Sequence, residues 1–402
     1  MTPAARPRRV LIIVENLPVP FDTRVWNEAT TLAAAGYGVS VICPATAGFD
    51  RRFETRDGVC IYRHPLPAAA AGKLAYLGEY AAAAFWQSRL AWRVWRERGF
   101  DLIHACNPPD TVFLLGLFFK LLAGKRFVFD HHDLSPELYA VKFGRRDLLY
   151  KMLVRLERWS LRVADVVIAT NDSYRRVAIE RGGVNPRRVW VVRSGPRPER
   201  LRLLPPNPVW KRGREFLVGY VGVMSRQDGV HYLLEAAHHI VHAAGRRDVH
   251  FALIGDGPES AALRAHSASL GVADHVTFAG RLPDNELIEM LNTADVCVNP
   301  DEVNEMNDKS TMNKVMEYMA LGKPVVQFET TEGRFSAQEA ALYARPNDAR
   351  DLAARILELL ADPARRAEMG AIGMERIRAG LGWPHQAVQL LAAYDAAFGG
   401  RS

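Results

Sequence analysis

Residues 310–328 read STMNKVMEYMALGKPVVQF and combine a short helix with the strand that follows it. Ser310 or Thr311 is suited to cap a helix over residues 312–321, and Gly322 is suited to end it. The apolar run at the end of the segment predicts a buried strand. A helix followed closely by such a strand is the repeating unit of a parallel α/β sheet.

The start of this helix suits a diphosphate, and its middle suits a ribose. Free backbone N–H groups and the positive end of the helix dipole attract anions, and Lys314 lies one turn in. The Glu317 carboxylate is placed to accept two hydrogen bonds from a vicinal diol. Together these features predict a nucleotide ligand. The alternative interpretation is that Glu317 is a solvated helix carboxylate.

Strands alternate with helices along the whole chain, which predicts two doubly wound α/β domains. A proline-rich stretch at residues 197–214 interrupts the alternation and predicts a linker. The strands are expected within residues 10–16, 39–44, 100–105, 126–133, 164–171 and 188–195, and then within 215–222, 250–257, 275–280, 295–300 and 324–328.

The composition indicates a globular protein and argues against several other classes. Of 402 residues, 49% are hydrophobic and 24% charged, as in a globular protein. The four cysteines lack metal-ligand spacing, which favours a reducing compartment and argues against structural zinc. The basic start of the chain has too short an apolar run for a signal peptide, and the apolar run at residues 112–119 is too short to span a membrane.

Positive charge is concentrated in the first half of the chain. Residues 1–200 carry 31 Lys and Arg against 19 Asp and Glu, whereas the whole chain has a net charge of +7. A basic domain predicts a partner with anionic groups, such as nucleic acid, phospholipid headgroups or a phosphorylated acceptor.

The segment at 310–328 resembles the donor-binding signature of family 4 glycosyltransferases, which are retaining enzymes with the GT-B fold. The resemblance implies two Rossmann-like domains that face a cleft. Residues 1–197 would bind the acceptor, residues 198–380 would bind a nucleotide-sugar donor, and residues 381–402 would form a helix that packs back on the N-terminal domain.

The same resemblance assigns roles within the segment. In the family, a glutamate at the position of Glu317 holds the ribose, and the backbone at the helix start holds the pyrophosphate. In this chain, the helix start comprises Ser310, Thr311 and Met312. The family often has another glutamate eight residues before the position of Glu317. This chain has Lys309 there, and the difference favours a donor with a different substituent.

The loop GVMSRQDG at residues 222–229 follows the first expected strand of the second half. A glycine such as Gly222 lets the backbone approach a phosphate. Family 4 enzymes typically have an arginine after the first glycine and a lysine before the last, but this chain has Val223 and Asp228 there. Arg226 is therefore the cation that this loop offers. The alternative is a plain strand–helix turn.

Two further loops follow strands of the second half. Gly255 and Asp256 belong to a GxG turn, which alone is weak evidence for a site. The resemblance places this turn near the nucleotide and donor sugar, and it makes Arg281 the residue most suited to contact the base. A tight turn and a surface arginine are the alternatives.

Two motifs in the first half carry candidate catalytic groups. Arg24 and Glu28 follow the first strand and suit the phosphates or the acceptor, although a local ion pair on a helix is the alternative. The segment FDHHDLSPE at residues 129–137 ends another strand. By resemblance, His132 contacts the donor sugar. Asp133 and Glu137, which complete the catalytic set, orient this histidine or meet the acceptor hydroxyl.

Residues 76–98 and 148–162 mix basic with aromatic or aliphatic side chains. Such stretches suit an anionic membrane interface. The alternative is a pair of core-facing helices with solvated basic backs.

The combined prediction is a retaining glycosyltransferase, transferring a hexosyl or N-acetylhexosaminyl group, of bacterial polysaccharide or lipopolysaccharide biosynthesis. It would use a nucleotide-sugar, with UDP favoured over GDP, and a glycan or lipid-linked acceptor. No metal, other cofactor or nucleic acid is expected. The expected location is cytoplasmic, with peripheral attachment to the inner face of the plasma membrane left open. A GT-B sugar-nucleotide 2-epimerase and a non-catalytic nucleotide-sugar-binding protein are the alternatives.

Overall fold

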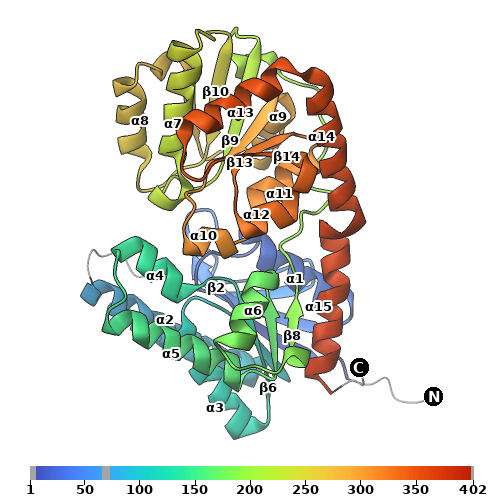
Figure 1. Cartoon of the computed structure of the whole chain (residues 1–402). Coiled ribbons are helices and arrows are strands. Elements are labelled where there is room, and N and C mark those ends of the chain that lie inside the picture. The colour runs from blue at the N-terminus through green and yellow to red at the C-terminus, as the bar shows by residue number, and fades with distance from the viewer. Residues whose placement is uncertain (1–5, 66–72, 400–402) are drawn as a thin grey trace, which may run out of the picture. The chain divides into compact units, whose positions relative to one another are not determined.

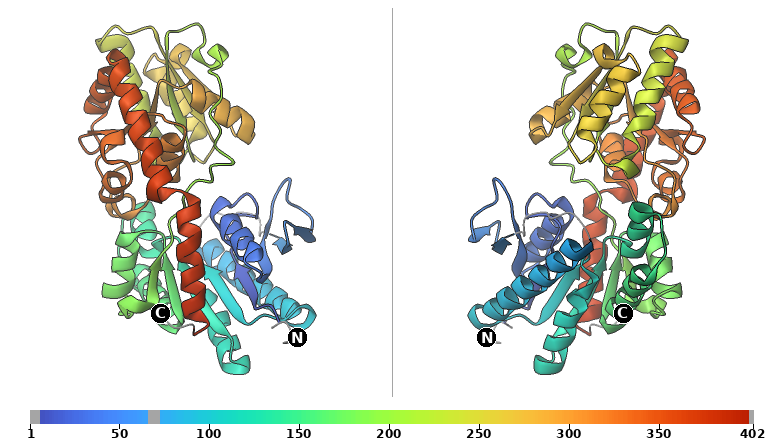
Figure 2. Two further views of the ribbon diagram at one scale, coloured as in Figure 1. Left: turned by 90° about the vertical axis from the view of Figure 1, so that its right-hand side faces the viewer. Right: turned by 90° about the vertical axis from the view of Figure 1, so that its left-hand side faces the viewer.

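The chain forms two α/β units in a computed structural model that describes residues 6–65 and 73–399. The N-terminal unit comprises Met1–Ser194 and Gln386–Ser402, and the C-terminal unit comprises Gly195–His385. In each unit, helices cover a central sheet (Figures 1 and 2). The prediction of two Rossmann-like domains is confirmed.

The N-terminal unit is built on an eight-stranded sheet in the order β3-β4-β2-β1-β5-β6-β7-β8. β3 pairs antiparallel with β4, and the other neighbouring strands pair parallel. The strands are β1 (Arg9–Ile13), β2 (Gly38–Ala45), β3 (Phe53–Arg56), β4 (Val59–Pro65), β5 (Leu102–Cys106), β6 (Arg126–His131), β7 (Val166–Ala169) and β8 (Val189–Val191). The α-helices are α1 (Thr23–Ala34), α2 (Lys73–Glu97), α3 (Phe113–Ala123), α4 (Ser135–Phe143), α5 (Leu148–Val163), α6 (Asp172–Glu180) and most of α15 (Trp383–Ala397).

The buried strands of this sheet are apolar on both faces because helices cover both sides. Every residue of β5 is buried, and α3 lies close against β6. A Cβ on Gly116 of α3 would lie 2.5 Å from the Phe127 ring, so only glycine permits this close approach.

The C-terminal unit has a six-stranded sheet in the order β11-β10-β9-β12-β13-β14, with every neighbouring pair parallel. Its strands are β9 (Phe216–Val221), β10 (Val249–Ile254), β11 (Val276–Gly280), β12 (Val296–Asn299), β13 (Val325–Phe328) and β14 (Ala341–Ala344). Its α-helices are α7 (Val230–His238), α8 (Ser260–Ser269), α9 (Asp284–Thr293), α10 (Glu305–Lys309), α11 (Asn313–Ala320), α12 (Thr331–Ala337), α13 (Ala349–Ala361) and α14 (Pro363–Arg376).

The order of strands reverses once in each sheet. In the N-terminal unit the reversal lies between β1 and β5, and in the C-terminal unit it lies between β9 and β12. Open α/β sheets bind ligands beyond the carboxyl ends of the strands at such a point. The loops after these strands are therefore the first places to look for a site.

The segment at 310–328 folds nearly as predicted. The strand Val325–Phe328 is confirmed, and Gly322 has the positive φ of 67° expected of a residue that ends a helix. The predicted cap is wrong, because α11 begins only after Met312. Ser310 instead ends the preceding helical turn, α10, where its hydroxyl donates to the Met306 carbonyl over 2.8 Å.

The final helix, α15, contacts the N-terminal sheet and its loops. The Tyr394 hydroxyl lies 2.8 Å from His104 Nδ1 on β5, and the Gln386 side-chain oxygen accepts a hydrogen bond of 2.9 Å from the Arg193 amide. None of the helices in the described ranges is long and apolar enough to cross a membrane.

Candidate active site

Three strand ends of the C-terminal unit meet at the predicted donor loops. The Gly222 amide donates to the Ile254 carbonyl over 3.0 Å, and the Gly255 amide donates to the Gly280 carbonyl over 2.8 Å. A Cβ on Gly255 would lie 1.8 Å from the Gly222 carbonyl oxygen, and φ at Gly255 is +132°. Glycine is required here because the two loops touch through their backbones.

The start of α11 joins these loops. A Cβ on Gly222 would lie 3.2 Å from Lys314 Nζ, so the predicted phosphate-binding lysine faces the first loop. That Nζ already lies 2.6 Å from Asp301 Oδ1 and 3.7 Å from Asp228 Oδ1. Burial raises the pKa of Asp301 to about 6, although Lys314 opposes this change. The lysine is therefore held by two carboxylates, which the sequence did not reveal.

Glu317 is also held by a partner within the unit. Its Oε1 accepts a hydrogen bond of 2.5 Å from Arg200, and the same guanidinium forms two further bonds with Asp284 at the start of α9. Burial raises the pKa of Glu317, and Arg200 opposes this increase. The interpretation of Glu317 as an isolated, solvated carboxylate is wrong.

The other predicted donor residues line the same loops. Arg226 and Arg281 are exposed, and no ion pair to either is seen in the described part of the chain. Asp256 accepts hydrogen bonds from the Ser260 hydroxyl and the Gly257 amide, and these lower its pKa. Lys309 forms a 3.1 Å ion pair with Glu305 of its own helix and has no identified role at the site.

Thr311 lies beside α12, where its hydroxyl is 3.5 Å from the Glu332 carboxylate. Neither Ser310 nor Thr311 caps α11, so the backbone at the helix start does not use these hydroxyls. The amide groups that follow Met312 remain the predicted anion-binding element.

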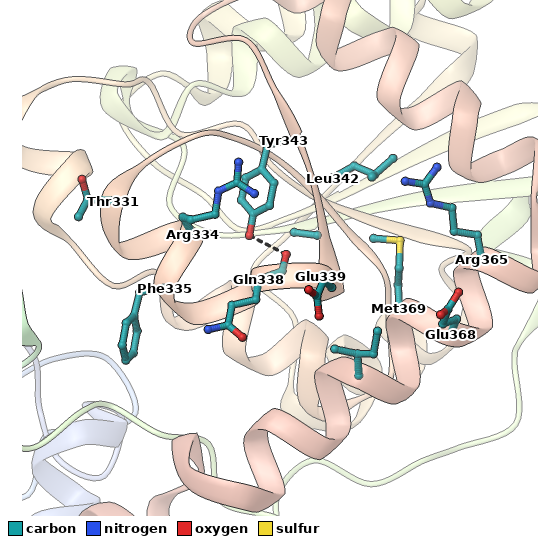
Figure 3. Close-up of a pocket in the computed structure, with 12 residues that line it drawn as sticks. Thr331, Arg334, Phe335, Gln338, Glu339, Leu342, Tyr343, Arg365, Glu368 and Met369 are labelled. Atoms are coloured by element: carbon teal, nitrogen blue, oxygen red, sulfur yellow. Dashed lines mark hydrogen bonds between the residues drawn. The ribbon is translucent and has the colours of Figure 1, made fainter.

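A separate pocket of about 910 Å³ lies along the edge strand β14 and is bounded by α12 and α14 (Figure 3). Its two arginines have partners outside the pocket lining, because Arg334 pairs with Glu329 and Arg365 pairs with Glu358. The Tyr343 hydroxyl donates to the Gln338 carbonyl over 2.9 Å. None of the predicted donor residues lines this pocket.

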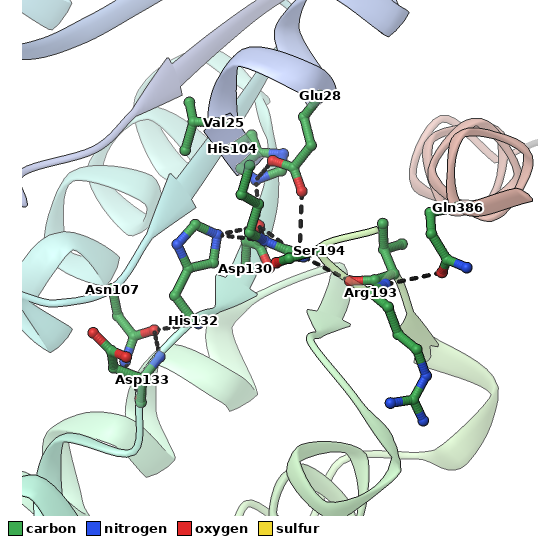
Figure 4. Close-up of polar contacts among 12 residues, drawn as sticks. Val25, Glu28, His104, Asn107, Asp130, His132, Asp133, Arg193, Ser194 and Gln386 are labelled. Atoms are coloured by element: carbon green, nitrogen blue, oxygen red, sulfur yellow. Dashed lines mark hydrogen bonds and ion pairs between the residues drawn. The ribbon is translucent and has the colours of Figure 1, made fainter. Parts of the chain in front are cut away.

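In the N-terminal unit, Glu28, His104 and Asp130 belong to a buried polar network at the end of β6 (Figure 4). Arg24 is also buried and makes several of the contacts of this network. Its Nη2 lies 2.8 Å from Asp130 Oδ1 and 3.2 Å from Glu28 Oε1. Its Nη1 donates to the Val192 carbonyl over 2.7 Å and to the Ser194 hydroxyl over 3.2 Å. Because its donors are used within the unit, Arg24 is not placed to bind a phosphate.

His132 lies at the edge of this network. Its Nε2 is 2.6 Å from Asp130 Oδ2 and 2.9 Å from Arg24 Nε, and its side chain is 12% exposed. The Asn107 side-chain oxygen accepts hydrogen bonds of 2.7 and 3.2 Å from the amides of His132 and Asp133. Asn107 thus fixes the turn that carries both predicted catalytic residues. Burial raises the pKa of the Asp133 carboxyl.

Four potential metal ligands, Glu28, His104, Cys106 and Asp130, lie within 4.8 Å of one another in this network. Burial tends to raise the pKa of Asp130, but Arg24 and His132 together hold that pKa well below its usual range. Burial and the Asp130 charge raise the pKa of Glu28 well above its usual value. The Arg24 guanidinium thus lies directly beside the two acidic members of this cluster, 2.8 Å from Asp130 and 3.2 Å from Glu28.

Glu137 belongs to a different cluster. It is 1% exposed, and Arg181 binds its two carboxylate oxygens over 2.6 and 3.1 Å. Arg181 also binds Glu157, which in turn lies 3.2 Å from His131. These contacts join α4, α5 and the end of α6. Both carboxylate oxygens of Glu137 are therefore occupied by a partner within the unit.

Known family models match both units. Residues 22–200 match a model described as Glycosyltransferase Family 4, and residues 215–362 match one described as Glycosyl transferases group 1. The chain is a family 4 glycosyltransferase with the GT-B fold.

Similar proteins agree with this family. The chain is 27% identical over 264 residues to a 2-deoxystreptamine glucosyltransferase of Streptomyces kanamyceticus, covering 62% of this chain and 65% of that one, just under two thirds of its length. A sucrose-phosphate synthase of Thermosynechococcus elongatus superimposes with a TM-score of 0.81 at 21% identity, covering 98% of this chain and all of that one. HepE of Anabaena, solved with UDP-glucose, superimposes with a TM-score of 0.75 at 17% identity, covering 96% and 99% of the two chains.

Several residues that shape the two sites were missed by the sequence analysis. They are His104, Asn107, Asp130, Arg200, Asp284 and Asp301. Asn107, Asp130, Asp284 and Asp301 lie at or shortly after strand ends, which is the signal that could have identified them. His104 lies within β5 and Arg200 lies in the linker after β8, so this signal does not apply to them.

Proposed function

We propose that this glycosyltransferase moves a sugar from a nucleotide-sugar donor to a hydroxyl of a glycan acceptor with retention at the anomeric carbon. The observation that carries the proposal is the convergence of Gly222, Gly255 and Lys314 beside the end of β9, which borders the reversal point of the C-terminal sheet, with Glu317 one turn further along α11. This set offers close backbone approach, a cation and a carboxylate, which suit a diphosphate and a ribose. The complex of HepE with UDP-glucose supports UDP as the nucleotide.

The chemistry needs a good leaving group more than a protein nucleophile. Backbone amides at the start of α11, with Lys314 and Arg226, would stabilise the negative charge that develops on the departing diphosphate. That diphosphate can accept the proton of the attacking hydroxyl on the same face of the sugar. We assign His132 and Asp133 as the N-terminal unit's contribution to the reaction, and Arg24, Glu28 and Glu137 to its structure.

We infer that the reaction requires no metal ion. The chain has no Asp-x-Asp motif, and protein cations are available for the diphosphate. Transfer should persist in EDTA. Complete loss that Mg²⁺ or Mn²⁺ restores would contradict this inference.

We also propose that the acceptor is lipid-linked and that the N-terminal unit attaches to an anionic membrane surface. The support comes from α3, which is apolar on both sides. Phe113, Gly116 and Phe119 are buried, whereas four large side chains on the other side are 48–79% exposed. We call these four the α3 stripe: Leu114, Phe118, Leu121 and Leu122.

Neighbouring helices carry further exposed aromatic side chains, which contact the buried side of α3. Trp92 of α2 contacts Phe119 of α3 at a ring distance of 6.5 Å, and Trp159 of α5 contacts Phe113 at 6.0 Å. Trp92 and Trp159 are 43% and 50% exposed. Within residues 76–98, the side chains of 76, 77, 79 and 80 lie outside the described residues. Arg89, Trp92, Arg93, Arg96 and Glu97 line a depression on α2.

A panel of UDP-, GDP- and dTDP-sugars tests the function, with thermal shift as the binding readout and product analysis after addition of an acceptor. Binding of one donor class, followed by transfer or slow hydrolysis, is the expected result. An epimerised donor in the absence of acceptor would identify a 2-epimerase. Binding without any turnover would identify a non-catalytic binding protein.

A further inference from the structure

Arg200 joins three segments of the C-terminal unit that the proposed donor site uses. It comes from the linker that follows β8, whereas Glu317 lies on α11 and Asp284 begins α9. Arg200 Nε and Nη2 donate to the two Asp284 carboxylate oxygens over 2.8 and 2.9 Å. Nη1 is then left to donate to Glu317 Oε1 over 2.5 Å.

This geometry fixes the direction of the Glu317 carboxylate. A guanidinium that forms two hydrogen bonds with one carboxylate cannot rotate freely. Its third nitrogen, here Nη1, therefore donates in a fixed direction. Glu317 Oε1 receives that donor, and no described residue donates to Oε2. The unpaired oxygen is therefore available to a ligand hydroxyl.

The same contact controls the charge of the carboxylate. The Glu317 side chain is only 19% exposed. The charged groups that act on Glu317 are Arg200 from the linker and Asp284 from α9, and only Arg200 lowers its pKa. A protonated carboxylic acid has one oxygen occupied by a proton, so it accepts a diol less well than a carboxylate does.

Asp284 connects this pair to the loop before α9. Residues 280–282 run from the end of β11 into that loop, and they are the stretch that the family resemblance assigns to the nucleobase. Arg200 thus links the ribose carboxylate to the start of the helix that follows the base loop.

We propose that Arg200 is a positioning residue of the donor site, which keeps Glu317 ionised and directs its free oxygen toward the nucleotide ribose. This role rests on the proposed function. It predicts that loss of Arg200 weakens nucleotide binding by making Glu317 easier to protonate, and not only by removing a contact.

The test is calorimetric binding of UDP, or of GDP if the donor panel selects guanosine, at several values between about pH 5.5 and 8.5. Arg200→Gln is compared with wild type at each pH, so that titration of the nucleotide phosphate cancels in the ratio of the two dissociation constants. This ratio should grow as the pH falls, by at most about tenfold per pH unit for one proton. Arg200→Lys keeps a cation but cannot form the two-bond fork. Its ratio of dissociation constants to wild type should therefore change less with pH than the ratio for Arg200→Gln does.

Two matched variants separate the possible failures. Glu317→Gln cannot titrate, so the double variant Arg200→Gln/Glu317→Gln should lose the extra pH dependence. Asp284→Asn leaves Arg200 in place and should weaken binding by a pH-independent factor of a few. Circular dichroism and thermal unfolding check that each variant folds, and Arg200→Lys serves if Arg200→Gln does not.

A ratio that is constant with pH would overturn the positioning role, as would unchanged affinity in Arg200→Gln. If Glu317→Gln and Glu317→Ala also bind the nucleotide as well as wild type does, the ribose assignment itself fails. If only the Arg200 variants behave like wild type, the proposed donor site stands and the inference about Arg200 fails.

Discussion

Arg24 in the N-terminal unit and Arg200 in the C-terminal unit each bind two carboxylates, but they differ in exposure. The Arg24 side chain is 6% exposed, and its partners Glu28 and Asp130 are fully buried. The Arg200 side chain is 27% exposed, and its partners Glu317 and Asp284 are 19% and 60% exposed. The first group is closed to ligands, whereas the second is open on one side.

This difference separates a buried polar network from the proposed ligand site. Arg24 donates to groups of its own unit on every side, so a phosphate would have to break those bonds. Glu317 retains one carboxylate oxygen that no described residue occupies. The same residue types therefore serve opposite purposes, and burial decides which.

The strongest way to break this comparison is Arg24→Met. This change leaves the Asp130 carboxylate buried without its guanidinium partner, and breaking such a pair costs about 3–5 kcal/mol of unfolding free energy. Differential scanning calorimetry should show a large decrease in the unfolding free energy of the N-terminal unit. The affinity for the nucleotide should not change. Arg226→Met, at an exposed position, should change stability by no more than about 0.5 kcal/mol. Equal effects of the two substitutions would show that the Arg24 network is not structural.

The corresponding substitution in the more exposed group around Arg200 is Glu317→Ala. A hydrogen bond to a charged group contributes about 1.5–3 kcal/mol, so donor affinity should fall roughly 10- to 150-fold. Stability should change little, because Arg200 keeps Asp284 as its partner. Titration calorimetry with the donor measures the effect, and Glu305→Ala on α10 is the control. Unchanged affinity would remove Glu317 from the site.

The sequence predicted the parts of the fold that depend on local patterns. Buried strands such as Val325–Phe328 and the turn at Gly322 follow from apolar runs and from backbone preferences of single residues. The predicted cap of α11 was wrong because a short helix, α10, comes directly before α11 and has Ser310 as its C-cap.

Long-range partners of charged groups could not be predicted in this way. Arg24 and Asp130 are 106 residues apart, and Arg200 and Glu317 are 117 residues apart. Local spacing gave Arg24 and Glu28 as an ion pair, but only the fold shows that Asp130 completes it. Sequence therefore located the loops of the candidate site more reliably than it located the free side chains within them.

The carboxylates around Lys314 predict that the donor affinity of the C-terminal unit depends on pH. Asp301 opposes the binding of a diphosphate only when it is ionised, and its pKa is about 6. Asp301→Asn should therefore tighten binding of the nucleotide-sugar donor several-fold at about pH 8, and have little effect at about pH 5, where the wild-type group is largely neutral. Calorimetric affinity ratios of variant to wild type at each pH test this. A ratio that does not change with pH would show that Asp301 does not face the diphosphate.

The smallest expected effect concerns the α3 stripe, because each contribution to interfacial binding is modest. Each Lys or Arg near an anionic surface contributes about 1 kcal/mol, and buried apolar surface adds about 25 cal/mol per Å². Replacing Leu121, which is 79% exposed, with Asp should weaken binding to anionic vesicles without changing donor affinity. Flotation with anionic and neutral liposomes at low and high salt measures this, since salt screens the charge term. Val388 of α15, 62% exposed, gives the matched control Val388→Asp. If the wild-type enzyme floats with neither kind of vesicle, the basic and apolar surface is not a membrane site, and a soluble acceptor becomes the better assignment.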